Sequence, residues 1–221
     1  MNVNTMNDIN QSILKCPNLN LENPLCSRYL NAIPLVMVPV NTQRVLLISR
    51  DPSNIANSNN TLTGWDNTFF RQHVLEVFFR YYKKKAAKTN IKYFNEYQKM
   101  FHENVYWTHF SKCFPGKDDR GNHNQPNGVC AAKYLSLEIE AVDPVFIVLM
   151  GKHSIELITE CNNVESINKN GNNFLYNQGK KIPLLCLTHP SNSNNKCKNN
   201  PLYKYSETVE MIRDLMEKIY A

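Results

Sequence analysis

Glycine and long apolar runs are both scarce in this chain. Only 7 of the 221 residues are glycine, and no Gly-rich loop follows the first predicted strand, which weighs against a nucleotide-binding α/β domain. No apolar run approaches the roughly 18 residues that a membrane helix needs. The opening residues, MNVNTMNDINQS, lack the basic and then apolar pattern of a secretory signal. The sequence therefore favours a cytoplasmic protein (nucleoid-associated in a prokaryote) that does not contact a membrane.

Charge and cysteine content narrow the class further. The formal net charge of +6 permits a polyanionic partner such as nucleic acid without identifying it. Seven cysteines without an export signal argue against a disulfide framework. Buried apolar thiols, reactive thiols and metal ligands remain. Cys161 and Cys186 lie in apolar patterns and are interpreted as core residues, and Cys197 lies in an Asn/Lys-rich stretch and is interpreted as an exposed, incidental thiol. The cysteines that this leaves for other roles are Cys16, Cys26, Cys113 and Cys130.

Four short apolar runs are typical of buried strands. They cover residues 45–49, 105–110, 145–150 and 182–187. Helical patterns lie between them, at 91–102 and 129–142 among others, and strands that alternate with helices indicate βαβ units. We therefore predict one α/β domain over residues 1–221, with a mainly parallel sheet covered on both faces.

Segments outside these strands carry weaker patterns. Residues 1–30 are predicted to be an irregular N-terminal segment, with weak helical character at 8–14 and prolines further on. Residues 162–179 are polar and are predicted to form a loop. Residues 65–82 predict an amphipathic helix. Its expected buried stripe consists of Phe70, Val74, Val77, Phe78 and Tyr81.

Two of the strands end in a proline-containing turn with one ionisable side chain. The run RVLLISRDPS carries Asp51, and the run KIPLLCLTHPS carries His189. In an open parallel sheet, ligands bind beyond the carboxyl ends of the strands, so we expect both side chains in one crevice. A third run, VYWTHFSKCFP, ends comparably and contributes His109, Lys112 and Cys113.

Four motifs, in order, resemble those of the uracil-DNA glycosylase superfamily, and of its iron–sulfur branch in particular. They are RDPS, TH-x-x-KC, C-x3-YL-x2-EI before DP-VFIVLMG, and THPS. The resemblance covers most of the chain from residue 44 onward. It implies a three-layer α/β/α sandwich with a central four-stranded, mainly parallel sheet. It also implies a monomeric, monofunctional enzyme that flips uracil or a related deaminated base out of DNA and hydrolyses the N-glycosidic bond.

The resemblance assigns Asp51 and His189 to catalysis. Asp51 aligns with the Asp of the Gln-Asp-Pro motif, where a carboxylate stabilises an oxocarbenium-like sugar and positions the attacking water. His189 matches the His of the His-Pro-Ser motif, whose imidazole donates a hydrogen bond to the base carbonyl. The alternatives are a turn or helix-cap role for Asp51 and a buried strand-end role for His189.

The resemblance also assigns substrate-binding residues. Ser191 would hold a DNA phosphate. Phe69 or Phe70 would stack on the flipped base, with Phe69 favoured because Phe70 has helical spacing with Val74 and Val77 in the expected buried stripe. His109 stands where the iron–sulfur branch has Asn, and an imidazole cannot copy a bidentate amide. Ser53 stands where a bulky Tyr excludes the thymine methyl group, and Arg50 completes the set. Uracil is the first expectation for the base, and 5-substituted pyrimidines or a deaminated purine are the alternatives. The alternative to an enzyme is a catalytically weak member of the superfamily that binds DNA or a protein.

The remaining cysteines resemble cluster ligands. Cys113 and Cys130 match two ligands of the iron–sulfur branch, and Cys16 and Cys26 would complete the four thiolates of a [4Fe–4S] cluster. The C-x9-C spacing of the N-terminal pair is wider than the usual C-x2-C. Four thiolates would also satisfy a structural zinc ion, and the absence of any metal is the third possibility.

Overall fold

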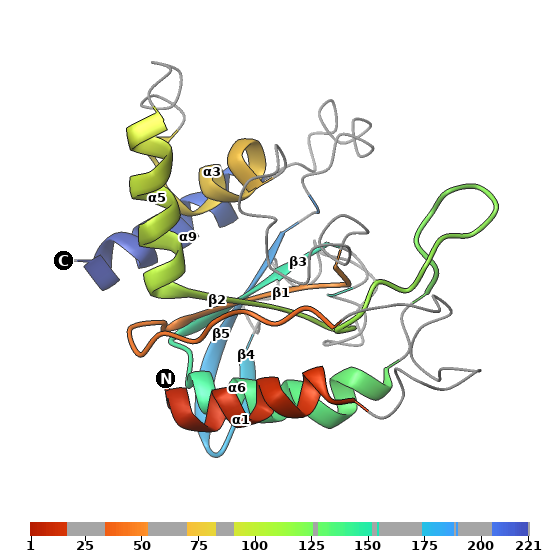
Figure 1. Cartoon of the computed structure of the whole chain (residues 1–221). Coiled ribbons are helices and arrows are strands. Elements are labelled where there is room, and N and C mark those ends of the chain that lie inside the picture. Colours follow the sequence, from red (N-terminus) through yellow and green to blue (C-terminus); the bar gives the residue numbers. More distant parts are fainter. Residues whose placement is uncertain are drawn as a thin grey trace.

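A five-stranded sheet forms the centre of the protein (Figure 1). The computed structural model describes residues 1–16, 34–52, 70–82, 91–125, 128–151, 154, 174–187, 189 and 205–220. The strands lie in the order β2-β1-β3-β5-β4. Four of them are parallel, which confirms the predicted mainly parallel sheet; their bounds are β1 Val45–Ser49, β2 Val105–His109, β3 Phe146–Met150 and β5 Lys180–Leu187.

Helices cover both faces of this sheet, as predicted for a three-layer sandwich (Figure 1). One face carries α1 (Val3–Leu14) and α6 (Ser136–Val142). The other carries α3 (Leu75–Phe78), α5 (Ile91–Asn104) and α9 (Tyr205–Tyr220). Two π-helical turns, η3 (Phe70–Val74) and η4 (Ala131–Leu135), lead into α3 and α6. Every residue of β1, β2 and β3 is buried, as expected for strands covered on both sides.

The prediction of four strands is wrong because a short fifth strand lies at the edge of the sheet. β4 (Phe174–Asn177) runs antiparallel to β5 and occupies part of the predicted loop. Gln178 and Gly179 connect the two strands with φ angles of 49° and 78°. Two successive residues with positive φ are typical of a type I′ hairpin turn. β4 has only four residues and none of its side chains is fully buried, so its sequence shows no clear alternation of apolar and polar residues.

The N-terminal segment is more ordered than predicted. α1 begins at Val3, and the Asn2 side chain caps it by accepting a hydrogen bond from the Thr5 backbone N–H at 3.2 Å. Met6 and Ile13 are buried in the main hydrophobic core. The helical character predicted at 8–14 is confirmed, and the prediction of an irregular segment is wrong for residues 3–7. Residues 17–30 lie outside the described part of the chain. Among the described residues, no helix combines the length and the apolar content needed to cross a membrane.

The predicted stripe of residues 65–82 is confirmed except at its end. Phe70, Val74, Val77 and Phe78 are all buried, whereas Tyr81 is 55% exposed and Tyr82 is buried in its place. The helix ends at Phe78, and Phe79 has extended backbone angles (φ −126°, ψ 110°). Helical spacing therefore no longer determines which side chain faces the core beyond this point.

The strand register brings the predicted functional turns to one edge of the sheet. Ser49 pairs with His109 on one side and with Met150 on the other, and Met150 pairs with Leu187. Chain order reverses around β1, because β2 lies on one side of it and β3 on the other. The carboxyl edge next to such a switch point is where open α/β sheets bind ligands.

Candidate active site

Asp51 and His189 lie close together beyond the carboxyl ends of β1 and β5. Burial lowers the pKa of His189 to about 4, and the nearby Asp51 carboxylate opposes that shift. Three cationic or titratable neighbours lower the pKa further: Arg50, His123 and His73. His189 is therefore a neutral imidazole near pH 7, beside an acidic side chain from a distant part of the sequence. The two groups therefore lie near each other at this edge of the sheet, and their predicted place in one ligand-binding crevice stays a prediction.

The Asp51 carboxylate is held from two sides. Its Oδ1 atom accepts a hydrogen bond from Arg50 Nε, and its Oδ2 atom lies 2.5 Å from His123 Nδ1. Only 2% of the Asp51 side chain is exposed. The turn itself is fixed to β2, because the backbone N–H of Ser111 donates to the Arg50 carbonyl at 2.9 Å.

Gly151 lets the end of β3 pass close to the His189 turn. Its φ angle is +92°, and its backbone N–H donates to the Leu187 carbonyl at 2.7 Å. A Cβ atom added at this position would lie 3.3 Å from the His189 Cβ atom. Both the backbone conformation and the close approach therefore require glycine here.

His109 forms a buried, neutral wall of the same region. Burial first, and then the Lys112 cation, lower its pKa to about 3, while Asp51 opposes the shift. Its ring stacks on Trp107 (centroids 5.8 Å apart, planes at 26°), which stacks in turn on Phe70. Trp107 is fixed by a 2.9 Å hydrogen bond from its Nε1–H to Ser49 Oγ. Among the described residues, the buried His109 Nδ1 atom has no hydrogen-bond partner.

A buried ion pair supports the segment that carries His109. Lys112 Nζ lies 2.5 Å from Glu138 Oε2 and also donates to Thr108 Oγ1 and the His109 carbonyl, each at 2.7 Å. Thr108 donates to the other Glu138 oxygen at 2.9 Å. Both charged side chains are 1% exposed. Burial raises the pKa of Glu138, and the Lys112 cation opposes this shift. The network ties the end of β2 to α6.

Sequence reasoning missed His123. It lies in the loop of residues 115–127 after β2, whose Gly, Asn and Asp content predicts only irregular structure. Its contact with Asp51 joins residues 72 positions apart, and no local pattern indicates such a pairing. The one signal in the sequence is that His123 follows His109 in the loop that leaves the carboxyl end of β2.

A family comparison agrees with this geometry. The model of the uracil DNA glycosylase superfamily matches residues 37–215. The chain belongs to this superfamily. Its members hydrolyse N-glycosyl bonds in DNA, so membership supports a DNA glycosylase type of function, with DNA as the partner. A search of curated proteins returned no match.

The superfamily motifs include several residues whose positions the structure does not describe. Ser53, Phe69 and Ser191 lie outside the described residues, so their assignments to substrate binding stay predictions. Phe70 is fully buried between Phe101 and Trp107, with its ring centroid 5.3 Å from that of Phe101. Its predicted role in the core is confirmed.

Three of the four predicted cluster cysteines lie near enough to influence one another electrostatically. Cys113 follows β2, Cys130 precedes η4, and Cys16 follows α1. Burial, followed by the proximity of Cys130 and Cys16, raises the pKa of Cys113 to about 12. Within the described ranges, no group of three or more His, Cys, Asp or Glu side chains is placed to hold a metal ion. Cys26 lies outside those ranges, and Cys186 is buried as predicted.

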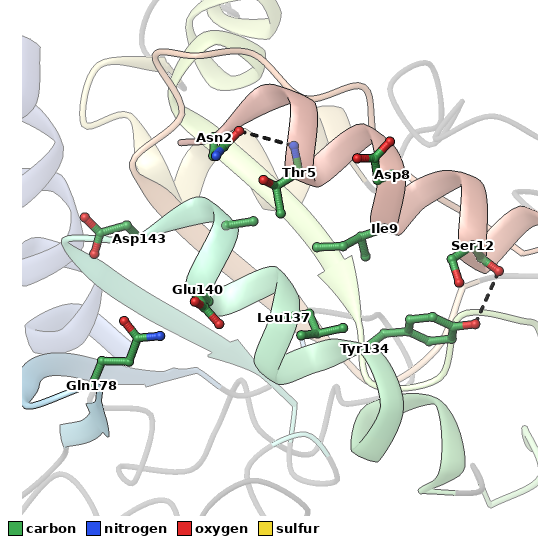
Figure 2. A pocket seen from close by; sticks show the side chains of 11 residues that line it. Asn2, Thr5, Asp8, Ile9, Ser12, Tyr134, Leu137, Glu140, Asp143 and Gln178 are labelled. Atoms are coloured by element: carbon green, nitrogen blue, oxygen red, sulfur yellow. Dashed lines mark hydrogen bonds between the residues drawn. The ribbon is translucent and has the colours of Figure 1, made fainter.

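A separate groove of about 750 Å³ lies between α1, α6 and the β4–β5 turn (Figure 2). Asp8, Glu140 and Asp143 line it together with apolar side chains such as Leu137. Figure 2 shows these carboxylates on both sides of the groove. Asp143 precedes β3 and Gln178 precedes β5, so this groove reaches the amino edge of the sheet and not the edge that carries Asp51.

Proposed function

We propose that this protein is a monofunctional DNA glycosylase that removes uracil or a related deaminated base from DNA. The observation that carries the proposal is the convergence of Asp51 and His189 at the carboxyl edge of the sheet. Asp51 follows β1 and His189 follows β5, and both strands are held in parallel register with their neighbours. A flipped nucleoside placed there would have its base within reach of the neutral His189 imidazole and its sugar within reach of the Asp51 carboxylate. No catalytic lysine is required for hydrolysis of this kind.

His189 would stabilise the leaving base. Its pKa of about 4 keeps the ring neutral near pH 7, so one ring nitrogen carries a hydrogen that can be donated to a base carbonyl. As the glycosidic bond breaks, that carbonyl oxygen gains negative charge. A donor fixed in advance at this position lowers the barrier without a reorganisation step.

Asp51 would stabilise the sugar. The departing base takes the bonding electrons and leaves an oxocarbenium-like deoxyribose with positive charge. Arg50 and His123 fix the orientation of the Asp51 carboxylate. A carboxylate that is held in a largely buried position acts through a low local dielectric constant, where its attraction for a developing positive charge is strong.

His109 would contact the edge of the base. Its buried Nδ1 atom has no partner among the described residues, and an unsatisfied buried polar atom costs about 1–3 kcal/mol. A base that supplies the missing hydrogen bond would recover part of this free energy. Because a neutral imidazole offers one donor and one acceptor, this contact is less selective for uracil than an asparagine amide.

Base release from oligonucleotides tests the proposed function. Single- and double-stranded substrates would each carry one uracil, hypoxanthine, xanthine or thymine opposite guanine. We expect release from at least one of them, with loss of release in Asp51→Asn. Binding without release from any substrate would favour the alternative, a DNA-binding member with little catalytic activity.

We also propose that Cys16, Cys26, Cys113 and Cys130 hold a [4Fe–4S] cluster, with structural zinc as the alternative. Support comes from the electrostatic influence of Cys130 and Cys16 on Cys113, three thiols from separate elements, and from the preference of an iron–sulfur cluster and of structural zinc for four thiolates. When bound, the metal group would supply a structural crosslink between α1, η4 and the end of β2. It has no part in the hydrolysis as proposed.

Anaerobic purification followed by visible absorption and elemental analysis tests the metal proposal. We expect a brown protein that contains iron, and loss of colour in Cys113→Ser. Cys186→Ala is a matched control, because Cys186 is also buried but lies within β5. A colourless protein that contains zinc would assign the alternative, and a metal-free protein with full stability would contradict both.

A further inference from the structure

We propose that His123 is the general base that deprotonates the attacking water, and that Asp51 orients it. This inference rests on the proposed glycosylase function and adds a catalytic residue to it. An ionised carboxylate can only accept hydrogen bonds. The 2.5 Å contact between Asp51 Oδ2 and His123 Nδ1 therefore places the imidazole hydrogen on Nδ1. In the neutral ring, the lone pair is then on Nε2, which is the arrangement of the histidine in an Asp–His pair that activates a nucleophile.

Accessibility favours His123 over Asp51 as the group that meets water. The Asp51 side chain is 2% exposed, and Arg50 and His123 each occupy one of its oxygen atoms. The His123 side chain is 29% exposed. Among the described residues, nothing forms a hydrogen bond with its Nε2 atom. Asp51 thus acts on the reaction as a fixed charge and as an orienting partner, while His123 offers the accessible base.

The loop after β2 is built to hold His123 in place. Lys117 and His123 form an antiparallel bridge, and the Asn124 backbone N–H donates to the Gly116 carbonyl at 3.0 Å. At the tip, Asp118 Oδ1 accepts hydrogen bonds from the backbone N–H groups of Arg120 and Asn122 at 3.0 and 2.8 Å. The resulting hairpin returns the chain towards the sheet.

An aromatic contact fixes the plane of the His123 ring. Phe114 packs edge to face against it, with the centroids 5.0 Å apart and the planes at 84°. Phe114 itself is buried, five residues beyond the end of β2. The ring is therefore held by its contact with Phe114 and by Asp51 at Nδ1, and Asp51 leaves Nε2 available.

The reaction balances with these groups alone. The bond between the base nitrogen and the sugar C1′ atom breaks, and its electron pair leaves with the base, which His189 stabilises. The oxygen of a water molecule forms a new bond to C1′. One hydrogen of that water is transferred as a proton to His123 Nε2 and is later released to solvent. Asp51 keeps its negative charge throughout and stabilises both the sugar cation and the resulting imidazolium.

The test compares two substitutions at His123 under single-turnover conditions. His123→Gln retains an N–H donor for Asp51 but has no basic nitrogen, and His123→Ala removes both. We expect each to lower the rate of base release by at least about 100-fold. Binding of DNA that carries a non-cleavable nucleoside analogue should stay unchanged. His102→Gln is the matched control, because His102 lies in the last turn of α5, just before the amino end of β2, and should retain the wild-type rate.

The outcomes separate this inference from the proposed function. Wild-type release with full activity in His123→Gln would show that hydrogen-bond donation is sufficient, and would overturn the general-base role alone. A protein–DNA adduct that survives denaturation would mean that Nε2 bonds to the sugar carbon, which also overturns it. Wild-type protein that releases no base from any substrate would instead remove the proposed function, and this inference with it.

Discussion

Gly151 and His189 are in direct contact where the ends of β3 and β5 meet. A methyl group in place of the glycine hydrogen would lie 3.3 Å from the His189 Cβ atom. This distance is shorter than an ordinary van der Waals contact, so His189 would have to move by a few tenths of an ångström. The position of the histidine therefore depends on the absence of a side chain on the neighbouring strand.

Gly151→Ala should reduce both stability and base release. The φ angle of +92° is unfavourable for alanine, with a strain of about 1–3 kcal/mol, and the new methyl group displaces His189 from the base. Gly179→Ala is the matched control, since its φ is +78° and no atom lies within 4 Å of the added Cβ. We expect a similar loss of stability in both variants by thermal unfolding, but slower base release only in Gly151→Ala. Equal rates in the two would contradict the role of the contact.

Asp51→Asn should nearly abolish base release without unfolding the protein. The amide retains the shape of the carboxylate but loses its charge, and removal of one electrostatic group typically costs about 100- to 1,000-fold in rate. Single-turnover assays measure the loss, and circular dichroism with thermal unfolding checks the fold. Near-normal release in this variant would exclude Asp51 from the mechanism.

His109→Asn should make the protein less sensitive to acid. The pKa of His109 is about 3 in the folded protein and about 6.5 in the unfolded chain. Between these values the unfolded chain binds a proton that the folded protein does not, so stability falls as the pH falls. For one such histidine the slope is about 1.4 kcal/mol per pH unit.

Chemical denaturation between about pH 7 and pH 5 measures this slope. Asparagine does not titrate, so the His109→Asn protein should lose less stability over this interval than the wild type. His189 remains in the variant and its lowered pKa has the same sign, so part of the slope should persist. Identical slopes in the two proteins would contradict the burial of a neutral His109.

Glu138→Ala should destabilise the protein strongly. The substitution leaves the Lys112 ammonium group buried without its counter-charge, and breaking such a pair typically costs about 3–5 kcal/mol. Glu140→Ala on the same helix is the control, because Glu140 is exposed, and surface substitutions change stability by about 0.5 kcal/mol or less. Urea unfolding of both variants gives the two free energies. A loss below about 1 kcal/mol in Glu138→Ala would mean that the ion pair contributes little.

Features that depend on local patterns were predictable from the sequence. Continuous apolar runs located the four parallel strands to within two residues, because strands buried on both faces carry few polar positions. Turns after β1 and β5 placed Asp51 and His189 at one edge, since the carboxyl ends of parallel strands meet there. The end of α6 before Asp143 followed from the proline at position 144.

Features that depend on distant contacts were not predictable. His123 reaches Asp51 through a hairpin held by backbone hydrogen bonds and by the Asp118 and Asn124 side chains, and such bonds leave no periodic pattern in the sequence. Glu138 lies on a helix where its charge suggests an exposed position, and only the three-dimensional fold places it against Lys112. Tyr81 follows the helical period but is exposed, because the helix ends before it.

The N-terminal helix lies outside the stretch matched by the superfamily model, yet it is part of the interior. That match begins at residue 37, whereas Met6 and Ile13 of α1 are almost completely buried. Asn10 donates to the Met37 carbonyl at 2.8 Å and accepts from the Tyr106 hydroxyl at 3.0 Å. A fragment trimmed to the matched residues would leave these polar groups unpaired and an apolar surface open to solvent. We expect such a fragment to aggregate, so expression plasmids for this protein should retain its first sixteen residues.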